Sequence, residues 1–317
     1  MAALLAPVVP TVLWSRRADV AEDVSAGRGN RRYLDGYPLP SELEATDDLA
    51  VAVGGADLLV VGVPTHGFRH TLESAAAAVG PRTPVISLAK GFERSTGLRM
   101  SQVAAEVLPG RPVGVLTGPN LAREILEGRS AATVIAATDP AAASALQGLL
   151  ASDRFRVYTN EDLVGCELGG ALKNVIALAA GMAEGLDTGD NARAALITRG
   201  LAEMTRLGVA LGGAPMTFAG LAGMGDVMAT CMSSQSRNRW VGEQVGRGAA
   251  PDRVLAGMDQ VAEGVRTATV ACELAASVAM EVPVAEGVRS VFDDGRSPTE
   301  VWSALMARRT GPEVATT

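Results

Sequence analysis

Short apolar β-like runs alternate with Ala- and Leu-rich helical stretches through the first half of the chain. This alternation constrains the fold more than any other feature. The run at 56–64 is nearly continuous and apolar, as expected for a strand that is buried on both faces. Strands separated by helices predict an α/β fold whose parallel sheet is covered on both sides. The expected strands lie at 10–14, 56–64, 84–88, 113–117, 132–136 and 155–158.

The pattern changes at about Glu161. Long stretches rich in Ala, Leu, Gly and Met follow, with few β-branched clusters and no convincing strand. A chain of 317 residues is also long enough for two domains. We therefore expect a sheet domain over 1–160 and an all-helical domain over 161–317.

Charge and cysteine usage exclude several classes of function. The net charge is −7 and the arginines are scattered, whereas nucleic-acid binding needs clustered basic charge. Cys166, Cys231 and Cys272 are far apart and have no metal-ligand spacing, so we expect no metal site and interpret them as buried thiols of a reducing cytosol. His66 and His70 have the spacing of one helix face, which favours a structural role.

Targeting signals are not evident in the sequence. The longest apolar runs fall short of the roughly 20 residues that span a membrane. The first residues lack the basic region of a secretory signal. We therefore expect a cytoplasmic protein.

The beginning of the chain differs from that of a usual dinucleotide-binding fold. Such a fold opens with a strand, a Gly-rich turn and a helix whose N-terminus meets the pyrophosphate. Here no Gly-x-Gly-x-x-Gly precedes the strand at 10–14, and residues 1–6 look like the end of an Ala/Leu helix. We expect either that this element is missing or that the true start lies upstream, and we favour the second.

Arg16 and Arg17 follow the first expected strand. At this position an acidic residue binds the ribose hydroxyls of NAD, whereas Arg accommodates the 2′-phosphate of NADP. The pair leans toward NADP(H), although a solvated Arg pair at a strand end is an equally good interpretation.

Lys173 is the only charged residue between Glu167 and Glu184, and its neighbours are apolar except for Asn174. Apolar surroundings disfavour the charged form of an amine and thereby suit it to proton transfer. The alternative is a lysine that reaches the surface from an apolar helix, and periodicity alone favours this alternative.

Two glycine- or donor-rich segments follow in the second half. In 217–231, three glycines lead to Asp226, which suggests close approach of the backbone to a ligand or a helix. Asp226 could equally be a first-turn acid of the next helix. In 233–242, Ser236, Arg237 and Asn238 form a donor set suited to phosphate oxygens, although a solvated helix start would look the same.

Two turns of the sheet domain are also candidate ligand contacts. Lys90 and Gly91 follow the strand at 84–88, and Gly118 and Asn120 follow the strand at 113–117. Ligands of open α/β sheets bind beyond the carboxyl ends of the strands, so both turns are in position to contact one.

Together these segments resemble the bacterial NAD(P)-dependent glycerol-3-phosphate dehydrogenase family, from about Val12 to about Ala307. The resemblance is carried by Leu-Ala-Lys-Gly-Phe-Glu (88–93), Leu-Thr-Gly-Pro-Asn (116–120), Glu-Leu-Gly-Gly-Ala-Leu-Lys-Asn-Val (167–175), Gly-Leu-Ala-Gly-Met-Gly-Asp (220–226), Ser-Arg-Asn-Arg (236–239) and Val-Ala-Glu-Gly-Val-Arg-Thr (261–267).

The resemblance implies both a fold and a reaction. The fold is a Rossmann-like domain, here N-terminally incomplete, followed by a helical domain of the 6-phosphogluconate dehydrogenase C-terminal type. The reaction is reversible hydride transfer between NADPH or NADH and dihydroxyacetone phosphate, which gives sn-glycerol 3-phosphate for phospholipid synthesis. A homodimer is also implied.

Individual roles follow from the same resemblance. Lys173 resembles the general acid/base, and we expect Asp226 to orient Lys173 or a substrate hydroxyl. Asn120 stands where the family usually has Ser or Thr. The implied substrate contacts are Lys90, Gly118, Asn120, Asp226, Ser236, Arg237 and Asn238. The implied cofactor contacts are Arg16, Arg17, Tyr33, Lys90, Ala122, Arg237, Val261 and Glu263.

Two alternatives remain open. A related dehydrogenase acting on ketopantoate or a β-hydroxy acid would share the two-domain plan, but Ser-Arg-Asn-Arg favours a phosphorylated substrate. A non-catalytic or cofactor-deficient homologue would account for the missing Gly-rich turn.

Overall fold

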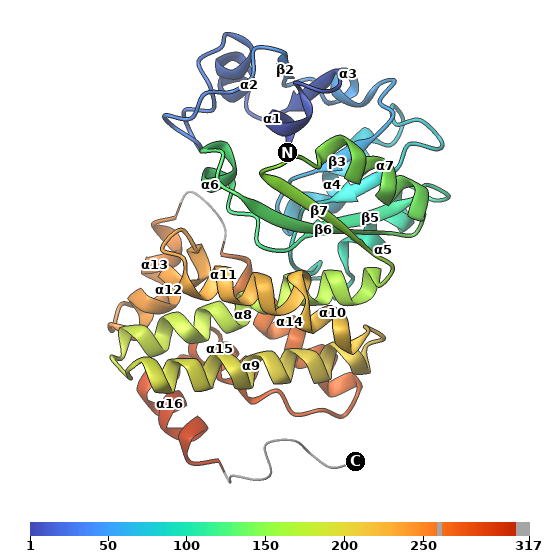
Figure 1. Cartoon of the computed structure of the whole chain (residues 1–317). Coiled ribbons are helices and arrows are strands. Elements are labelled where there is room, and N and C mark those ends of the chain that lie inside the picture. The colour runs from blue at the N-terminus through green and yellow to red at the C-terminus, as the bar shows by residue number, and fades with distance from the viewer. Residues whose placement is uncertain (259–261, 309–317) are drawn as a thin grey trace. The chain divides into compact units, whose positions relative to one another are not determined.

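A computed structural model describes residues 1–258 and 262–308 (Figure 1). The chain forms two compact units. The sheet unit holds Met1–Gly170 and Gly208–Asp226, and the helical unit holds Ala171–Leu207 and the described residues from Val227 onward. The sheet unit thus extends beyond residue 160, and the functional division expected there stays a prediction.

The sheet unit contains two sheets. In the smaller sheet, β1 (Thr11–Trp14) pairs in parallel with β2 (Leu43–Thr46). The larger sheet is visible at the centre of the unit in Figure 1. Its strands, in spatial order, are β3 (Leu59–Val61), β4 (Val85–Ser87), β5 (Val113–Thr117), β6 (Ala131–Ala137) and β7 (Phe155–Asn160). The predicted Rossmann-like α/β architecture is confirmed.

One strand direction differs from the expectation. β6 runs antiparallel to β5, with Val115 opposite Ala136, whereas the other paired strands are parallel. The expectation of a wholly parallel sheet is therefore wrong at this pair. The helix between the two strands, α6 (Ala122–Leu126), has five residues and is too short to carry the chain back along the sheet.

Helices cover both faces of the larger sheet. On one face Val85 packs with residues of α4 (Thr65–Ala75) and α5 (Met100–Val107), among them Phe68 and Met100. On the other face Ile86 packs with Leu146 of α7 (Pro140–Leu150). Adjacent residues of β4 thus enter different cores, because side chains alternate across a strand. Three short helices complete this part: α1 (Ala2–Leu5), α2 (Ala18–Ser25) and α3 (Leu49–Val53).

From Glu161 onward the described residues contain helices and no strand, as predicted. The long helices are α8 (Leu163–Gly185), α9 (Asp190–Ala210) and α14 (Glu263–Ser277). The shorter ones are α10 (Pro215–Ala219), the π-helix η1 (Leu221–Gly225), α11 (Asp226–Met232), α12 (Arg237–Gly246), α13 (Pro251–Ala256), α15 (Pro283–Phe292) and α16 (Pro298–Met306).

Within the part of the chain that is described, α8 is the helix long and apolar enough to cross a membrane by length and composition. Within its apolar 18-residue window, 89% is buried inside the protein. This burial is typical of the core helix of a soluble protein.

In the helical unit, α8 and α12 pack with their backbones in contact. Each helix carries Gly-x-x-x-Gly, which places its two glycines on one face: Gly181 and Gly185 on α8, Gly242 and Gly246 on α12. A Cβ on Gly242 would overlap the carbonyl oxygen of Leu178, and each of the other three would meet a facing carbonyl in the same way. We call these four residues the glycine seam.

Glu203 of α9 is a buried carboxylate that caps another helix. Its oxygens accept hydrogen bonds from the backbone of α15, at 2.8 Å from Val284 N and 3.0 Å from Ala285 N. Burial raises the pKa of Glu203 to about 7, although these two bonds and the nearby Arg206 oppose the shift.

Stability of the helical unit is therefore expected to depend on Glu203. Between pH 4.5 and about 7, Glu203 keeps its proton in the folded state, whereas the same carboxyl has lost it in the unfolded chain. The free energy of unfolding should consequently fall as pH rises through this window, then level off. Urea unfolding at several pH values measures the slope. Glu203→Gln should flatten it, and the exposed Glu273→Gln should not. An unchanged slope in Glu203→Gln contradicts the assignment.

Candidate active site

Two turns of the sheet unit meet where sequence reasoning expected a ligand. Lys90 follows β4 and Gly118 follows β5, and these parallel strands place their carboxyl ends at one edge. Lys90 Nζ donates a hydrogen bond to the Gly118 carbonyl at 2.7 Å. Gly118 has φ = 108°, which is accessible to glycine and strained for other residues. The glycine therefore permits the turn that offers this carbonyl to Lys90.

Asp226 joins the same cluster. Lys90 Nζ donates to Asp226 Oδ2 at 2.6 Å, and Asp226 is only 2% exposed. Asp226 is also the first residue of α11, so the interpretation as a first-turn acid holds as well. The pairing with Lys90 was not predicted. A buried carboxylate without a counter-ion is costly, so the pairing with Lys90 stabilises the Asp226 carboxylate.

Asn120 contributes a buried acceptor to this region. Within the described chain, the Asn120 side-chain oxygen and the Thr117 hydroxyl are buried and have no hydrogen-bond partner. Buried polar atoms of folded proteins are rarely left in this state. Asn120 Oδ1 could therefore accept a hydrogen bond from a group that the described chain does not supply.

The first turns of α8 are anchored to α5 and β5 within the sheet unit. Glu167 accepts hydrogen bonds from Ser101 N at 2.8 Å and from Ser101 Oγ at 2.5 Å, and it pairs with Arg99. A Cβ on Gly170 would lie 2.6 Å from Thr117 Oγ1. The glycines of the Glu-Leu-Gly-Gly motif thus allow close packing, which the sequence did not reveal.

Lys173 lies further along α8, in the helical unit, and is 7% exposed. Its Nζ donates a hydrogen bond to Thr230 Oγ1 of α11 at 2.6 Å. The alternative of a lysine that extends to the surface is therefore wrong. Thr230 was not predicted, because it lies 57 residues from Lys173 in the sequence.

Ser-Arg-Asn-Arg (236–239) has a different environment at each position. Ser236 caps α12 by accepting from Arg239 N at 3.2 Å. Asn238 donates to Asn174 Oδ1 at 2.9 Å and accepts from Gly264 N at 3.1 Å. Arg239 is buried and forms ion pairs with Glu184 and Glu243, at 2.9 and 3.0 Å. The second arginine is therefore structural, and Asn238 ties α8, α12 and α14 together.

Arg237 is the exposed cation of this segment. It begins α12 and lies within electrostatic range of Glu263, the first residue of α14. The helical unit thus brings two of the predicted cofactor contacts together. A third, Val261, lies outside the described residues.

The remaining predicted cofactor contacts belong to the sheet unit. Arg16 and Arg17 are exposed directly after β1. Arg17 forms a two-pronged ion pair with Asp19 and so holds the pKa of that carboxyl below its ordinary value. Tyr33 is half-buried and lies within electrostatic range of Arg17. Ala122 is the exposed first residue of α6.

The rarity of lysine in this sequence is a further indication of functional positions. Lys90 and Lys173 are the only lysines in the sequence, and every other basic side chain except the two histidines is Arg. Arg stays protonated in proteins, whereas Lys can release a proton. Lysine content alone would have singled out both positions.

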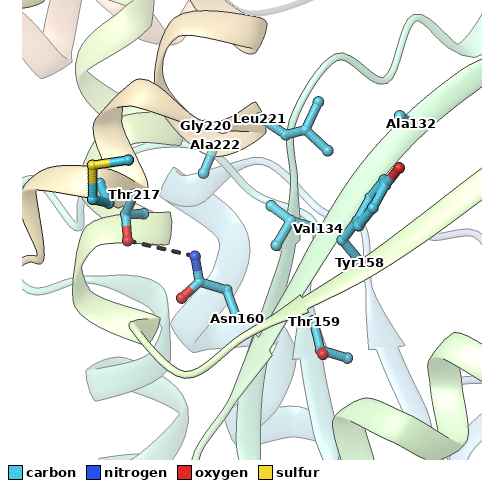
Figure 2. A pocket seen from close by; sticks show the side chains of 10 residues that line it. Ala132, Val134, Tyr158, Thr159, Asn160, Thr217, Gly220, Leu221 and Ala222 are labelled. Atoms are coloured by element: carbon cyan, nitrogen blue, oxygen red, sulfur yellow. Dashed lines mark hydrogen bonds between the residues drawn. The ribbon is translucent and has the colours of Figure 1, made fainter.

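A cavity within the described sheet unit lies away from these residues. It measures about 360 Å³ and is bounded by β6, β7, α10 and η1. Figure 2 shows its mostly apolar lining, in which Asn160 donates to Thr217 Oγ1 at 3.4 Å. No predicted site residue lines it, and its lining carries no charged side chain to bind a phosphate.

Family comparisons agree with the motif pattern. The family model described as NAD-dependent glycerol-3-phosphate dehydrogenase N-terminus matches residues 1–143, and the model of the C-terminus matches 162–303. A glycerol-3-phosphate dehydrogenase [NAD(P)+] 2 of Sphingopyxis alaskensis is 51% identical over 99% of this chain and 94% of its own length. One from Mycobacterium avium is 48% identical over 96% and 90%.

Solved structures show the same relation. The crystal structure of a glycerol-3-phosphate dehydrogenase from Coxiella burnetii is 34% identical, with a TM-score of 0.93 over 97% of this chain and 94% of that chain. A ketopantoate reductase from Ralstonia eutropha is 14% identical with a TM-score of 0.59, over 96% and 94%. At that identity the second likeness concerns the fold alone.

Proposed function

The chain belongs to the NAD-dependent glycerol-3-phosphate dehydrogenase family, and from this premise we propose its reaction. It transfers a hydride reversibly between NADPH or NADH and dihydroxyacetone phosphate, giving sn-glycerol 3-phosphate for glycerophospholipid synthesis. We further propose that it acts as a cytoplasmic homodimer. A non-catalytic role is not favoured, because near-full-length relatives of about half identity carry the name of the active enzyme.

One observation supports the reaction most directly: the buried amine of Lys173. A lysine that is 7% exposed and bonded to Thr230 Oγ1 at 2.6 Å has a fixed direction and little water around it. Reduction of a ketone places negative charge on the carbonyl oxygen, which needs a proton. Lys173 is proposed as the general acid that supplies this proton, and as the base in the reverse direction.

The other site residues bind and position the substrate. In the sheet unit, the Lys90 ammonium, the Gly118 turn, the Asn120 amide and the Asp226 carboxylate are proposed as triose contacts. In the helical unit, Arg237 is proposed to clamp the phosphate, with Ser236 and Asn238 as neutral partners. Binding the non-reacting phosphate holds the carbonyl in place for proton transfer.

The residues present fit a nicotinamide dinucleotide at its adenosine end. Arg16 and Arg17, exposed directly after β1, are proposed to bind the 2′-phosphate of NADP(H), and Tyr33 lies within electrostatic range of Arg17. Lys90, Ala122, Arg237, Val261 and Glu263 are proposed as further contacts. The cofactor, when bound, supplies or accepts the hydride.

Steady-state turnover tests the proposal. The purified protein should oxidise NADPH in the presence of dihydroxyacetone phosphate, monitored by loss of nicotinamide absorbance, and should be inactive with ketopantoate. Turnover of ketopantoate with no response to dihydroxyacetone phosphate would assign the chain to the related reductases. Inactivity with both substrates would contradict a dehydrogenase role.

Removal of the proposed phosphate clamp should act mainly on substrate binding. Arg237→Met is expected to raise KM for dihydroxyacetone phosphate by about 10- to 100-fold, the range for one lost charge-assisted contact. Arg247→Met, which removes an exposed arginine at the other end of α12, is the matched control. Equal KM values in both variants would rule out the clamp.

A further inference from the structure

Two charged residues, Asp19 and Arg32, lie near the proposed adenosine contacts Arg17 and Tyr33. Neither of them has a role among the cofactor contacts proposed so far. Arg17 donates to both carboxylate oxygens of Asp19, at 3.0 Å from Nε and 2.9 Å from Nη2. Both side chains are exposed, at 42% and 59%. A guanidinium uses this same pair of parallel donors to bind a phosphate group. Asp19 therefore occupies the two Arg17 donors, Nε and Nη2, that a bound phosphate would need.

Arg32 adds a second guanidinium to this group. Its Cζ lies 5.7 Å from the centre of the Tyr33 ring, a cation–π geometry. Asp19 is within electrostatic range of Arg32 as well as Arg17. Two guanidinium groups, one of them over an aromatic ring, thus lie within electrostatic range of one carboxylate in the first turn of α2.

The segment that carries Arg32 is fixed to α2 by Asp23. This carboxylate accepts from Arg28 Nε at 2.8 Å, and from Arg31 Nε and Nη2 at 2.8 and 2.7 Å. Asn30 Oδ1 accepts from Tyr33 N at 3.2 Å. Arg28 and Arg31 are thus engaged in holding the loop, and Arg32 is placed between two anchored residues.

We propose that Arg32 is a further ligand of the 2′-phosphate of NADP(H), and that Asp19 is a specificity-determining residue that favours NAD(H). The inference rests on the proposed function. Asp19 holds Arg17 and repels a phosphate, whereas it can accept a hydrogen bond from the free 2′-hydroxyl of NAD(H). Arg32 favours NADP(H) over NAD(H), because only NADP(H) carries the 2′-phosphate that Arg32 is proposed to bind.

Cofactor titration of the full-length protein tests both residues without any need for turnover. The Kd of NADPH and of NADH is measured by nicotinamide fluorescence for the unchanged protein, Asp19→Asn, Asp19→Ala and Arg32→Met. Glu106→Gln is the control, because Glu106 is an exposed carboxylate that forms an ion pair with another arginine of the same unit, Arg69.

Arg32→Met should raise the Kd of NADPH about tenfold, and both Asp19 variants should lower it about threefold. The Kd of NADH should not change with Arg32→Met and should not fall with either Asp19 variant. Equal shifts for the two cofactors, or no shift, would overturn the inference while leaving the proposed function intact. If the unchanged protein binds neither cofactor, both the proposed function and this inference are overturned.

Discussion

Lys173→Ala is expected to lower kcat by about 10²- to 10⁴-fold, the range for loss of a positioned general acid. The Kd of NADPH should change little, because the proposed role of this amine is confined to the carbonyl oxygen. Stopped-flow or steady-state NADPH oxidation measures the first quantity, and fluorescence titration measures the second. Parallel loss of turnover and cofactor binding would remove Lys173 from the proton-transfer role.

Lys173→Arg separates proton transfer from simple charge. The guanidinium keeps the positive charge but does not release a proton in proteins. Turnover should therefore stay low in Lys173→Arg, and recovery to near the unchanged rate would show that charge alone suffices. Thr230→Val tests positioning, since the hydroxyl that accepts from Nζ is removed while the amine remains. Its kcat should fall less than that of Lys173→Ala, with a shifted pH profile.

Gly242→Ala in the glycine seam is expected to lower the free energy of unfolding of the helical unit by about 2 kcal/mol or more. An added methyl group would overlap the carbonyl oxygen of Leu178, and backbone atoms cannot move aside without spreading α8 from α12. This cost exceeds the gain of about 1 kcal/mol that Ala brings to a helix interior. Urea unfolding followed by circular dichroism gives the value.

Gly148→Ala is the matched control for that prediction. Gly148 also lies within a helix, α7, but a Cβ there would meet no atom within 4 Å. The same substitution should therefore stabilise the protein by up to about 1 kcal/mol. If both variants shifted stability in the same direction, close packing at the seam would not explain the result.

Local sequence patterns predicted most strands of the sheet unit, but they missed β2 and the direction of β6. The strand expected at 113–117 is β5, and the one expected at 84–88 covers β4. β2 was missed because Leu-Glu-Ala-Thr has neither a β-branched cluster nor a continuous apolar run. The reversal at β6 depends on how far the connection travels in space, which apolar runs do not encode.

The candidate site shows the same limit. The motifs identified Lys90, Gly118, Lys173 and Asp226 as functional candidates. Their partners were not predictable, because the Lys90–Asp226 pair joins residues 136 positions apart. Tertiary packing brings such distant residues into contact. The sequence alone shows only that Asp226 follows several glycines and that Lys90 precedes one. Glu167 was likewise part of a recognised motif, but its bonds to Ser101 appear only in the folded chain.

The scarcity of lysine makes the protein unusually simple to probe with chemistry directed at amines. Within the given sequence such a reagent has two lysine targets: the side chain of Lys90 is 19% exposed, and Lys173 is 7% exposed. Acylation detected by mass spectrometry at either position therefore reports access to that amine in the folded protein. Protection from acylation by a bound ligand would identify the lysine that the ligand covers, without any substitution.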